Sequence, residues 1–166
     1  MELRFVDEHD GMLGWIDAGK LRRTSHALAE GGRVWLVDPV DGDGLDERIR
    51  ALGEPAGVIQ LLDRHQRDSA SLAARYGVPL HVVPRDLPGT PFELRGVVRN
   101  RFWQEAALWW PERRALVCAD VLGTLSYFRT GADEHAGVHP MLRLFPPRSL
   151  AGLEPRHLLV GHGAGL

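Results

Sequence analysis

The sequence predicts an α/β fold, and two patterns support that prediction. Residues 31–83 alternate short apolar runs with segments of helical spacing, in the order strand, helix, strand, helix, strand. This order is typical of βαβ units around a parallel sheet. The second half of the chain contains strand-like runs, two of which are joined by a short turn. With 166 residues the chain has the size of one domain, which we expect to span residues 1–166.

The first half of the chain contains six short segments that are expected to form strands. Gly31 and Gly32 separate the third segment from the fourth, and a Gly-Gly turn between two strands predicts a β-hairpin. Helical spacing of apolar residues predicts a helix over Leu45–Leu52, with Gly53 as its stop, and a second helix over Ser69–Tyr76. The six expected strands are Met1–Val6, Gly14–Ala18, Ser25–Ala29, Val34–Val37, Val58–Leu62 and Pro79–Val83.

The second half of the chain has fewer helical signals. Pro111–Arg114 is typical of a hairpin turn between two of the expected strands. Residues 124–147 contain several glycines and prolines, which predicts long loops, and a helical turn is expected over Ser149–Leu153. The expected strands are Phe92–Val98, Ala106–Trp110, Ala115–Cys118 and His157–Val160.

The composition argues against several classes of protein. A formal net charge of -2 argues against a general nucleic-acid binder, which normally has a basic face. No apolar run approaches the roughly 18 residues of a membrane span, and the N-terminus lacks a signal-peptide pattern. We therefore expect a cytoplasmic protein that acts on a small molecule rather than on nucleic acid or a membrane. Cys118 is the only cysteine, so a disulfide framework and a Cys-based zinc site are excluded.

The segment Gly57–Ser71 changes abruptly from apolar to charged. The expected strand Val58–Leu62 is followed by six polar or charged residues, Asp63-Arg64-His65-Gln66-Arg67-Asp68. Chemistry in open α/β folds collects at the carboxyl ends of strands, so this segment is a candidate site. A solvated loop with internal ion pairs is the alternative, because charge runs usually have that role.

The order of these landmarks resembles the metallo-β-lactamase superfamily. A hairpin ends in the Asp-containing turn Val37-Asp38-Pro39, and one helix later a strand ends in residues 63–68, at the place of the H-x-H-x-D-H motif. A later strand ends in Ala119-Asp120, where the family has Gly-Asp, and the last strand ends in Gly161-His162-Gly163. The resemblance covers roughly residues 25–163. It implies hydrolase chemistry and an αββα sandwich, in which two mixed sheets carry helices on their outer faces.

The resemblance also implies two metal ions and seven metal ligands, and this chain keeps three of them in kind. These are His65, Asp120 and His162. Asp63 and Asp68 replace two histidines of the central motif, and carboxylates can still bind zinc, manganese or magnesium. If a metal is bound, the expected ligands are Asp63, His65, Asp120 and His162, and the expected catalytic residues are Asp120 and Asp68.

Two expected ligands are replaced by arginine, which cannot bind a metal because its guanidinium stays protonated. Arg67 stands at the aspartate of the central motif, and counting back from the Pro111 turn places the third histidine on Arg101. Without metal ions, the converging carboxylates need another source of positive charge. We therefore expect Arg67 and Arg101 to be binding residues in an arginine–carboxylate network, with the Arg101 guanidinium within hydrogen-bonding distance of Asp63, Asp68 or Asp120.

These observations favour a metallo-hydrolase-like protein whose dinuclear site is degenerate and lacks the two-metal centre. One alternative is an active hydrolase in which a single metal, held by carboxylates and histidine, lowers the pKa of a bound water. The other alternative is a metal-free module that binds an anionic or polar small molecule, or a protein partner, through Arg67 and Arg101. The expected cofactor is therefore none or one divalent metal, with zinc preferred. The sequence does not indicate an oligomeric state.

Overall fold

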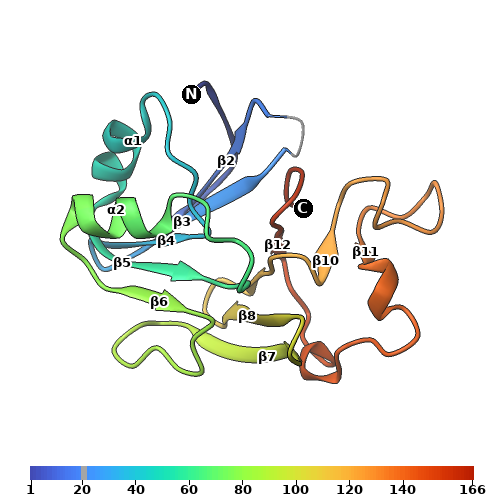
Figure 1. Cartoon of the computed structure of the whole chain (residues 1–166). Helices are drawn as coiled ribbons and strands as arrows, with labels where there is room; N and C mark the ends of the chain where they lie inside the picture. Colours follow the sequence, from blue (N-terminus) through green and yellow to red (C-terminus); the bar gives the residue numbers. More distant parts are fainter. Residues whose placement is uncertain (20–21) are drawn as a thin grey trace.

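Two mixed β-sheets form the centre of the computed structural model, which describes residues 1–19 and 22–166 (Figure 1). The first sheet has the strand order β1-β2-β3-β4-β5-β6, antiparallel from β1 to β4 and parallel from β4 to β6. Its strands are β1 (Leu3–His9), β2 (Met12–Asp17), β3 (Thr24–Glu30), β4 (Arg33–Val37), β5 (Glu54–Gln60) and β6 (Leu80–Val82).

The second sheet has the strand order β12-β9-β8-β7, with β12 parallel to β9 and the other pairs antiparallel. A small pair, β10 with β11, lies beside it. The strands are β7 (Glu93–Arg99), β8 (Gln104–Trp110), β9 (Ala115–Val117), β10 (Leu122–Gly123), β11 (Gly137–Val138) and β12 (His157–Leu159).

Alternation along the strands divides the apolar side chains between an inner and an outer layer. On β4, Trp35 and Val37 pack between the two sheets, where they meet Trp110 of the second sheet. Leu36 of the same strand faces the other way, toward the helices α1 (Leu45–Leu52) and α2 (Ser69–Tyr76). The two helices therefore cover the outer face of the first sheet, as Figure 1 shows.

The αββα sandwich expected from the sequence is confirmed, with one difference. The outer face of the second sheet is covered mainly by irregular chain and by two short 3-10 turns, η1 (Pro140–Leu142) and η2 (Arg148–Leu150). Apolar side chains of this segment pack against Leu116 and Cys118 of the sheet. The prolines and glycines of residues 124–147 explain why turns stand there instead of long helices.

Most expected elements are present, and the differences lie at their ends. β5 starts at Glu54 rather than Val58, because parallel pairing with β4 carries the strand through Pro55 and Gly57. The first strand extends to His9 rather than ending at Val6, since His9 still pairs with Met12 of β2. No helix among the described residues is long and apolar enough to cross a membrane.

Candidate metal centre

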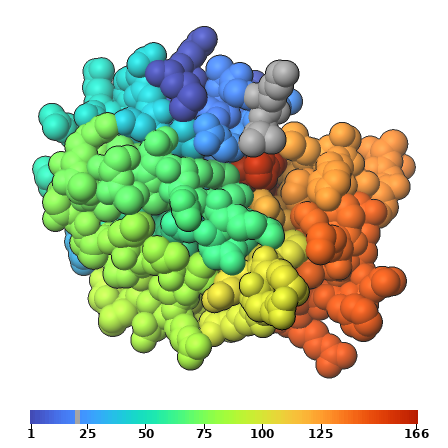
Figure 2. Space-filling model, viewed as in Figure 1, coloured from blue at the N-terminus to red at the C-terminus, as the bar shows by residue number. Residues whose placement is uncertain are grey.

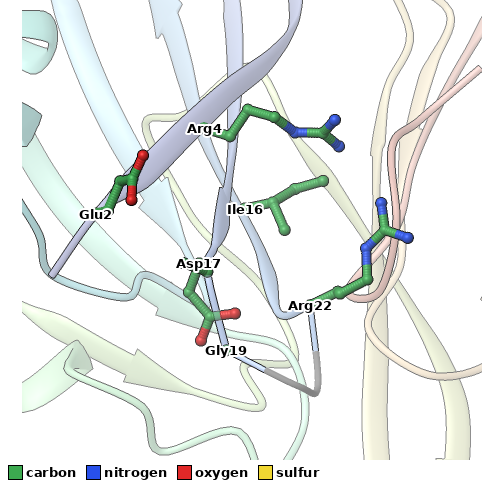
Figure 3. A pocket seen from close by; sticks show the side chains of 7 residues that line it. Glu2, Arg4, Ile16, Asp17, Gly19 and Arg22 are labelled. Atoms are coloured by element: carbon green, nitrogen blue, oxygen red, sulfur yellow. The ribbon is translucent and has the colours of Figure 1, made fainter.

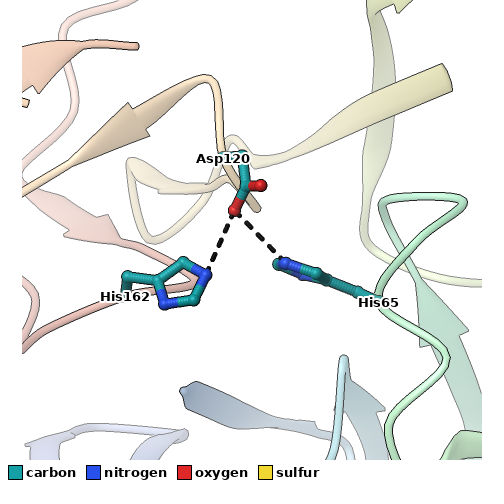
Figure 4. Close-up of side chains that lie close together, drawn as sticks. All are labelled: His65, Asp120 and His162. Carbon is teal, nitrogen blue, oxygen red and sulfur yellow. Dashed lines mark ion pairs between the residues drawn. The ribbon is translucent and has the colours of Figure 1, made fainter. Parts of the chain in front are cut away.

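Three side chains from distant parts of the sequence meet at one end of the sandwich (Figure 4). His65 follows β5, Asp120 follows β9 and His162 follows β12, so each comes from a loop after the carboxyl end of a strand. One ligand atom from each of the three residues lies within 4.8 Å of the others. Because each residue comes from a different loop, the sandwich itself, and not a local sequence motif, brings the three together.

The distances at this cluster fit the spacing of ligands around a metal ion. Asp120 Oδ1 lies 3.2 Å from His65 Nε2 and 3.4 Å from His162 Nε2. Donor atoms around a tetrahedral zinc ion are about 3.3 to 3.5 Å apart, since the bonds are about 2.0 to 2.2 Å long. Asp120 Oδ1 is also buried without a hydrogen bond of acceptable direction, although both imidazoles are close. A buried carboxylate oxygen that faces two imidazole nitrogens is the chemistry of a cation site.

Asp38 fixes the orientation of the His65 ring. His65 Nδ1 lies 3.1 Å from Asp38 Oδ2, and Asp38 Oδ1 accepts a hydrogen bond from Leu61 N at 2.9 Å. Asp38 has a left-handed backbone (φ 44°) at the end of β4, an uncommon conformation for a residue with a Cβ. When Nδ1–H donates to Asp38, the His65 Nε2 lone pair points toward Asp120, which is the tautomer that a metal ligand needs.

The charges at the cluster shift the two central pKa values in opposite directions. Burial alone would lower the pKa of His65, but the carboxylates of Asp120 and Asp38 raise it above its ordinary value. Burial alone would raise the pKa of Asp120, but His162 and His65 lower it far below its ordinary value. Asp120 is therefore ionised at neutral pH, and its charge favours the protonated form of His65 in the protein without metal.

Arg67 lies in the protein interior behind this cluster and donates to backbone carbonyls. Its Nη1 donates to Thr24 O and, at 2.8 Å, to Asp38 O, while its Nη2 donates to Gly161 O at 3.0 Å. Burial lowers the pKa of Arg67, and the charges of Asp38 and Asp120 partly oppose that shift. Like Asp38, Arg67 has a left-handed backbone (φ 42°). The guanidinium thus ties β3, β4 and the turn that carries His162 together, and none of its hydrogen bonds goes to a carboxylate.

Glu105 holds the backbone of Asp120 from the other side. This glutamate, at the start of β8, is completely buried. Its Oε1 accepts hydrogen bonds from Asp120 N and Val121 N, both at 2.9 Å, and its Oε2 accepts one from Trp103 Nε1 at 2.9 Å. Burial raises the pKa of Glu105 to about 7, although these donors lower it in part. The sequence analysis missed Glu105; its signal was a single acid within the apolar run of a buried strand.

Replacing Glu105 by glutamine should change how protein stability depends on pH. The folded pKa of about 7 is above the ordinary value of 4.5 for glutamate, so the stability linked to protonated Glu105 is present below about pH 4.5 and is lost as pH rises through 7. The wild type should lose up to about 3 kcal/mol over that range, and Glu105→Gln should not. Chemical denaturation of both proteins between pH 5 and pH 8, with chelator present, would measure the difference. If the free energies of unfolding of the wild type and Glu105→Gln differed by the same amount at every pH, the raised pKa of Glu105 would be contradicted.

Two other residues of the predicted site, Asp63 and Asp68, have different surroundings. Asp68 Oδ2 accepts a hydrogen bond from Asp41 N at 2.9 Å, so this carboxylate stabilises the turn before α1. Asp63 lies outside the three-residue cluster, and its backbone N donates to Gln104 O of β8. The structure therefore brings together three of the four predicted metal ligands and leaves Asp63 out.

The predicted placement of Arg101 beside the acids is wrong. Arg101 is exposed in the turn between β7 and β8, and its guanidinium lies 4.3 Å from the centre of the Phe102 ring. Among the described residues, no hydrogen bond or ion pair joins it to Asp63, Asp68 or Asp120. The physical reason is the structure of the turn. The Asn100 side chain accepts hydrogen bonds from Phe102 N and Trp103 N, and Arg101 is directed outward.

A separate pocket of about 460 Å³ lies at the end of β1 and β2 (Figure 3). Arg4 and Arg22 line it together with the acids Glu2 and Asp17, and Asp17 already forms an ion pair with Arg23 at 2.6 Å. The pocket has charges of both signs and contains none of the three converging ligands. We therefore place the candidate site at the His65–Asp120–His162 cluster. In the space-filling view, a small red part of the C-terminal segment is visible between the green and orange parts of the surface (Figure 2).

No protein-family model and no curated protein sequence matches the chain. Solved structures do. DIM-1 metallo-β-lactamase has a TM-score of 0.70 at 14% identity, with 99% of this chain and 91% of that chain covered. BLEG-1 B3 metallo-β-lactamase has a TM-score of 0.64 at 15% identity, with 91% of both chains covered. FIM-1 from Pseudomonas aeruginosa, in a mono-zinc form, has a TM-score of 0.63 at 11% identity, with 99% and 89% covered. The chain has the metallo-β-lactamase fold.

Proposed function

We propose that this protein is a metal-dependent hydrolase with a single divalent cation, preferably zinc, held by His65, Asp120 and His162. The observation that carries the proposal is the convergence of three ligand atoms within 4.8 Å from three separate loops. Two imidazoles and one carboxylate are also the donor set of catalytic zinc sites, which keep one position open for water. The three side chains are 11–20% exposed, so the cluster is within reach of solvent and of a substrate.

The residues around the cluster favour one cation over two. Arg67 stands where the resemblance places an aspartate for a second metal, and its buried guanidinium adds a positive charge there. The Asp68 carboxylate already accepts a hydrogen bond from Asp41 N, and Asp63 lies outside the cluster. A second cation would therefore lack ligands and would be repelled by Arg67.

Each neighbouring residue has a defined part in this proposal. A bound divalent metal would supply a water of lowered pKa and would polarise the bond to be broken. Asp38 holds the His65 ring in the ligating tautomer, and Glu105 holds the backbone of Asp120 through two amides. Arg67 ties the turn of His162 to β3 and β4 through three carbonyls. These contacts support a site that is rigid before any substrate arrives.

Cobalt substitution tests the proposal without knowledge of the substrate. We expect the protein to take up one cobalt ion per chain and to show a visible spectrum that changes near neutral pH, as an ionisable water on an open position would cause. The same preparation should hydrolyse at least one class among esters, thioesters and phosphodiesters, and His162→Ala should lose both signals. A pH-independent spectrum together with no hydrolysis of any class would contradict the proposal.

A further inference from the structure

A second feature lies on the surface beside the candidate metal centre: a pocket of about 310 Å³ lined largely by arginine. Arg85, Arg99 and Arg101 line it, together with Val83, Asn100 and Gln104. The first two come from the segment after β6 and the end of β7, and Arg101 comes from the turn that follows β7. Among the residues that the structure describes, no acidic residue lines the pocket. Three arginines therefore border one open space without an acidic neighbour among its six lining residues.

Several other arginines of the protein are already paired. Arg23, Arg75 and Arg113 form ion pairs with acids, and Arg67 donates to backbone carbonyls. By contrast, within residues 1–19 and 22–166 no ion pair joins Arg85, Arg99 or Arg101 to an acid, including the neighbouring Asp86. Like charges that share a pocket repel one another, so an anion that binds among them would relieve that cost.

The backbone around the pocket holds these arginines in place. A Cβ atom at Gly96 would lie only 2.7 Å from Arg99 Nε, so the missing side chain at Gly96 lets Arg99 fold back along β7. The register of β7 shifts between Gly96 and Val98, and a bulge of this kind redirects the side chains that follow it. Both features fix the position of Arg99.

The other two arginines are also held by local structure. Arg85 follows Val83, a β-branched residue with a left-handed backbone (φ 41°), which is a rare and strained conformation. Arg101 projects from a turn closed by Asn100, whose backbone N donates to Trp103 O at 3.0 Å. Strain of this kind persists where the surrounding structure fixes it, and it clusters at binding sites.

We propose that this pocket binds the phosphate groups of a small phosphorylated molecule. Guanidinium is a planar fork that matches phosphate oxygens in pairs, and three of them suit an anion that carries two or more charges. The volume exceeds that of one phosphate and fits a pyrophosphate group or a phosphoryl ester. Arg64, next to His65 in the sequence, donates a hydrogen bond to Phe102 O in the turn that carries Arg101. The pocket therefore lies beside the loop that contains His65. The proposal does not depend on a metal at that loop.

Titration of metal-free protein with inorganic pyrophosphate, by calorimetry in the presence of chelator, tests this inference. We expect saturable binding that weakens about tenfold or more for each of Arg99→Gln and Arg101→Gln, because each variant removes a charged hydrogen-bonding group. Arg50→Gln is the matched control: it removes the same charge from an exposed site on α1 and should leave the affinity unchanged. Gly96→Ala should also weaken binding, because it displaces Arg99.

Three outcomes would overturn the inference. One is the absence of saturable binding up to about 10 mM, the weak end of specific affinities. Another is an equal loss of affinity in Arg50→Gln, which would show a general effect of net charge. The last is tighter binding of a single-stranded oligonucleotide than of pyrophosphate at the same arginines, which would assign the pocket to nucleic acid. Because metal-free protein is used, none of these outcomes bears on the proposed metal site.

Discussion

Replacing Asp120 by asparagine is expected to reduce the affinity for zinc by about 100-fold or more. Asp120 Oδ1 is the atom that faces both imidazoles, at 3.2 and 3.4 Å. Asparagine keeps the shape of the side chain but removes the negative charge that would hold the cation. In the wild type, His162 and His65 favour that charge because they lower the pKa of Asp120. Loss even of a residue that only orients a metal ligand typically costs 10- to 100-fold in affinity, so loss of a charged ligand should cost at least that much. Competition with a chromophoric chelator would measure the change.

Asp63→Asn is the matched control for that experiment. It removes the same charge from the central motif of residues 63–68, but Asp63 is not part of the three-residue cluster. We therefore expect its zinc affinity to stay within about threefold of the wild type. Equal losses in Asp63→Asn and Asp120→Asn would show that the metal, if bound, sits elsewhere among these acids.

Replacing Arg67 by methionine is expected to destabilise the protein strongly. The variant removes the donor to three backbone carbonyls and a positive charge that lies near Asp38 and Asp120. Removing one partner of a buried charged interaction typically lowers the free energy of unfolding by about 3–5 kcal/mol. For a chain of this size that loss lowers the melting temperature by on the order of 10 °C. Thermal and chemical denaturation of metal-free protein would measure it.

Arg101→Ala provides the comparison for that measurement. Arg101 is exposed and stacks on Phe102, so its removal should change stability by no more than about 0.5 kcal/mol. Comparable losses in the two variants would contradict the assignment of Arg67 as the buried arginine of the site. If Arg67→Met melts within a degree of the wild type, its contacts to Thr24, Asp38 and Gly161 carry little stability.

The sequence predicts the positions of His65 and His162 because each follows a strand whose apolar pattern is easy to recognise. Asp120 is predicted for the same reason, since the run Ala115–Cys118 precedes it. The carboxyl ends of parallel strands meet at one edge of a sheet, and β9 and β12 are parallel neighbours. Strand order therefore explains why Asp120 and His162 lie together, whereas His65 follows β5 of the first sheet and joins them through the packing of the two sheets.

The position of Arg101 could not be obtained in that way. Counting residues back from the Pro111 turn does not show which way a side chain points, and the turn before β8 is closed by the side chain of Asn100, which leaves Arg101 exposed. The part of Asp68 depends on its hydrogen bond to Asp41, which lies 27 residues away in the sequence. Glu105 was missed because its three donors come from Trp103 and from the turn after β9. Contacts between loops decide all three cases, and local patterns do not show them.

The stoichiometry of zinc binding tests the central claim most directly. Metal-free protein would be titrated with zinc by calorimetry, and the metal retained after desalting would be counted by elemental analysis. We predict one tightly bound zinc ion per chain, held by His65, Asp120 and His162, because the described residues bring only these ligands together. Two zinc ions per chain would contradict the argument from Arg67, and no retained zinc would contradict the metal centre itself.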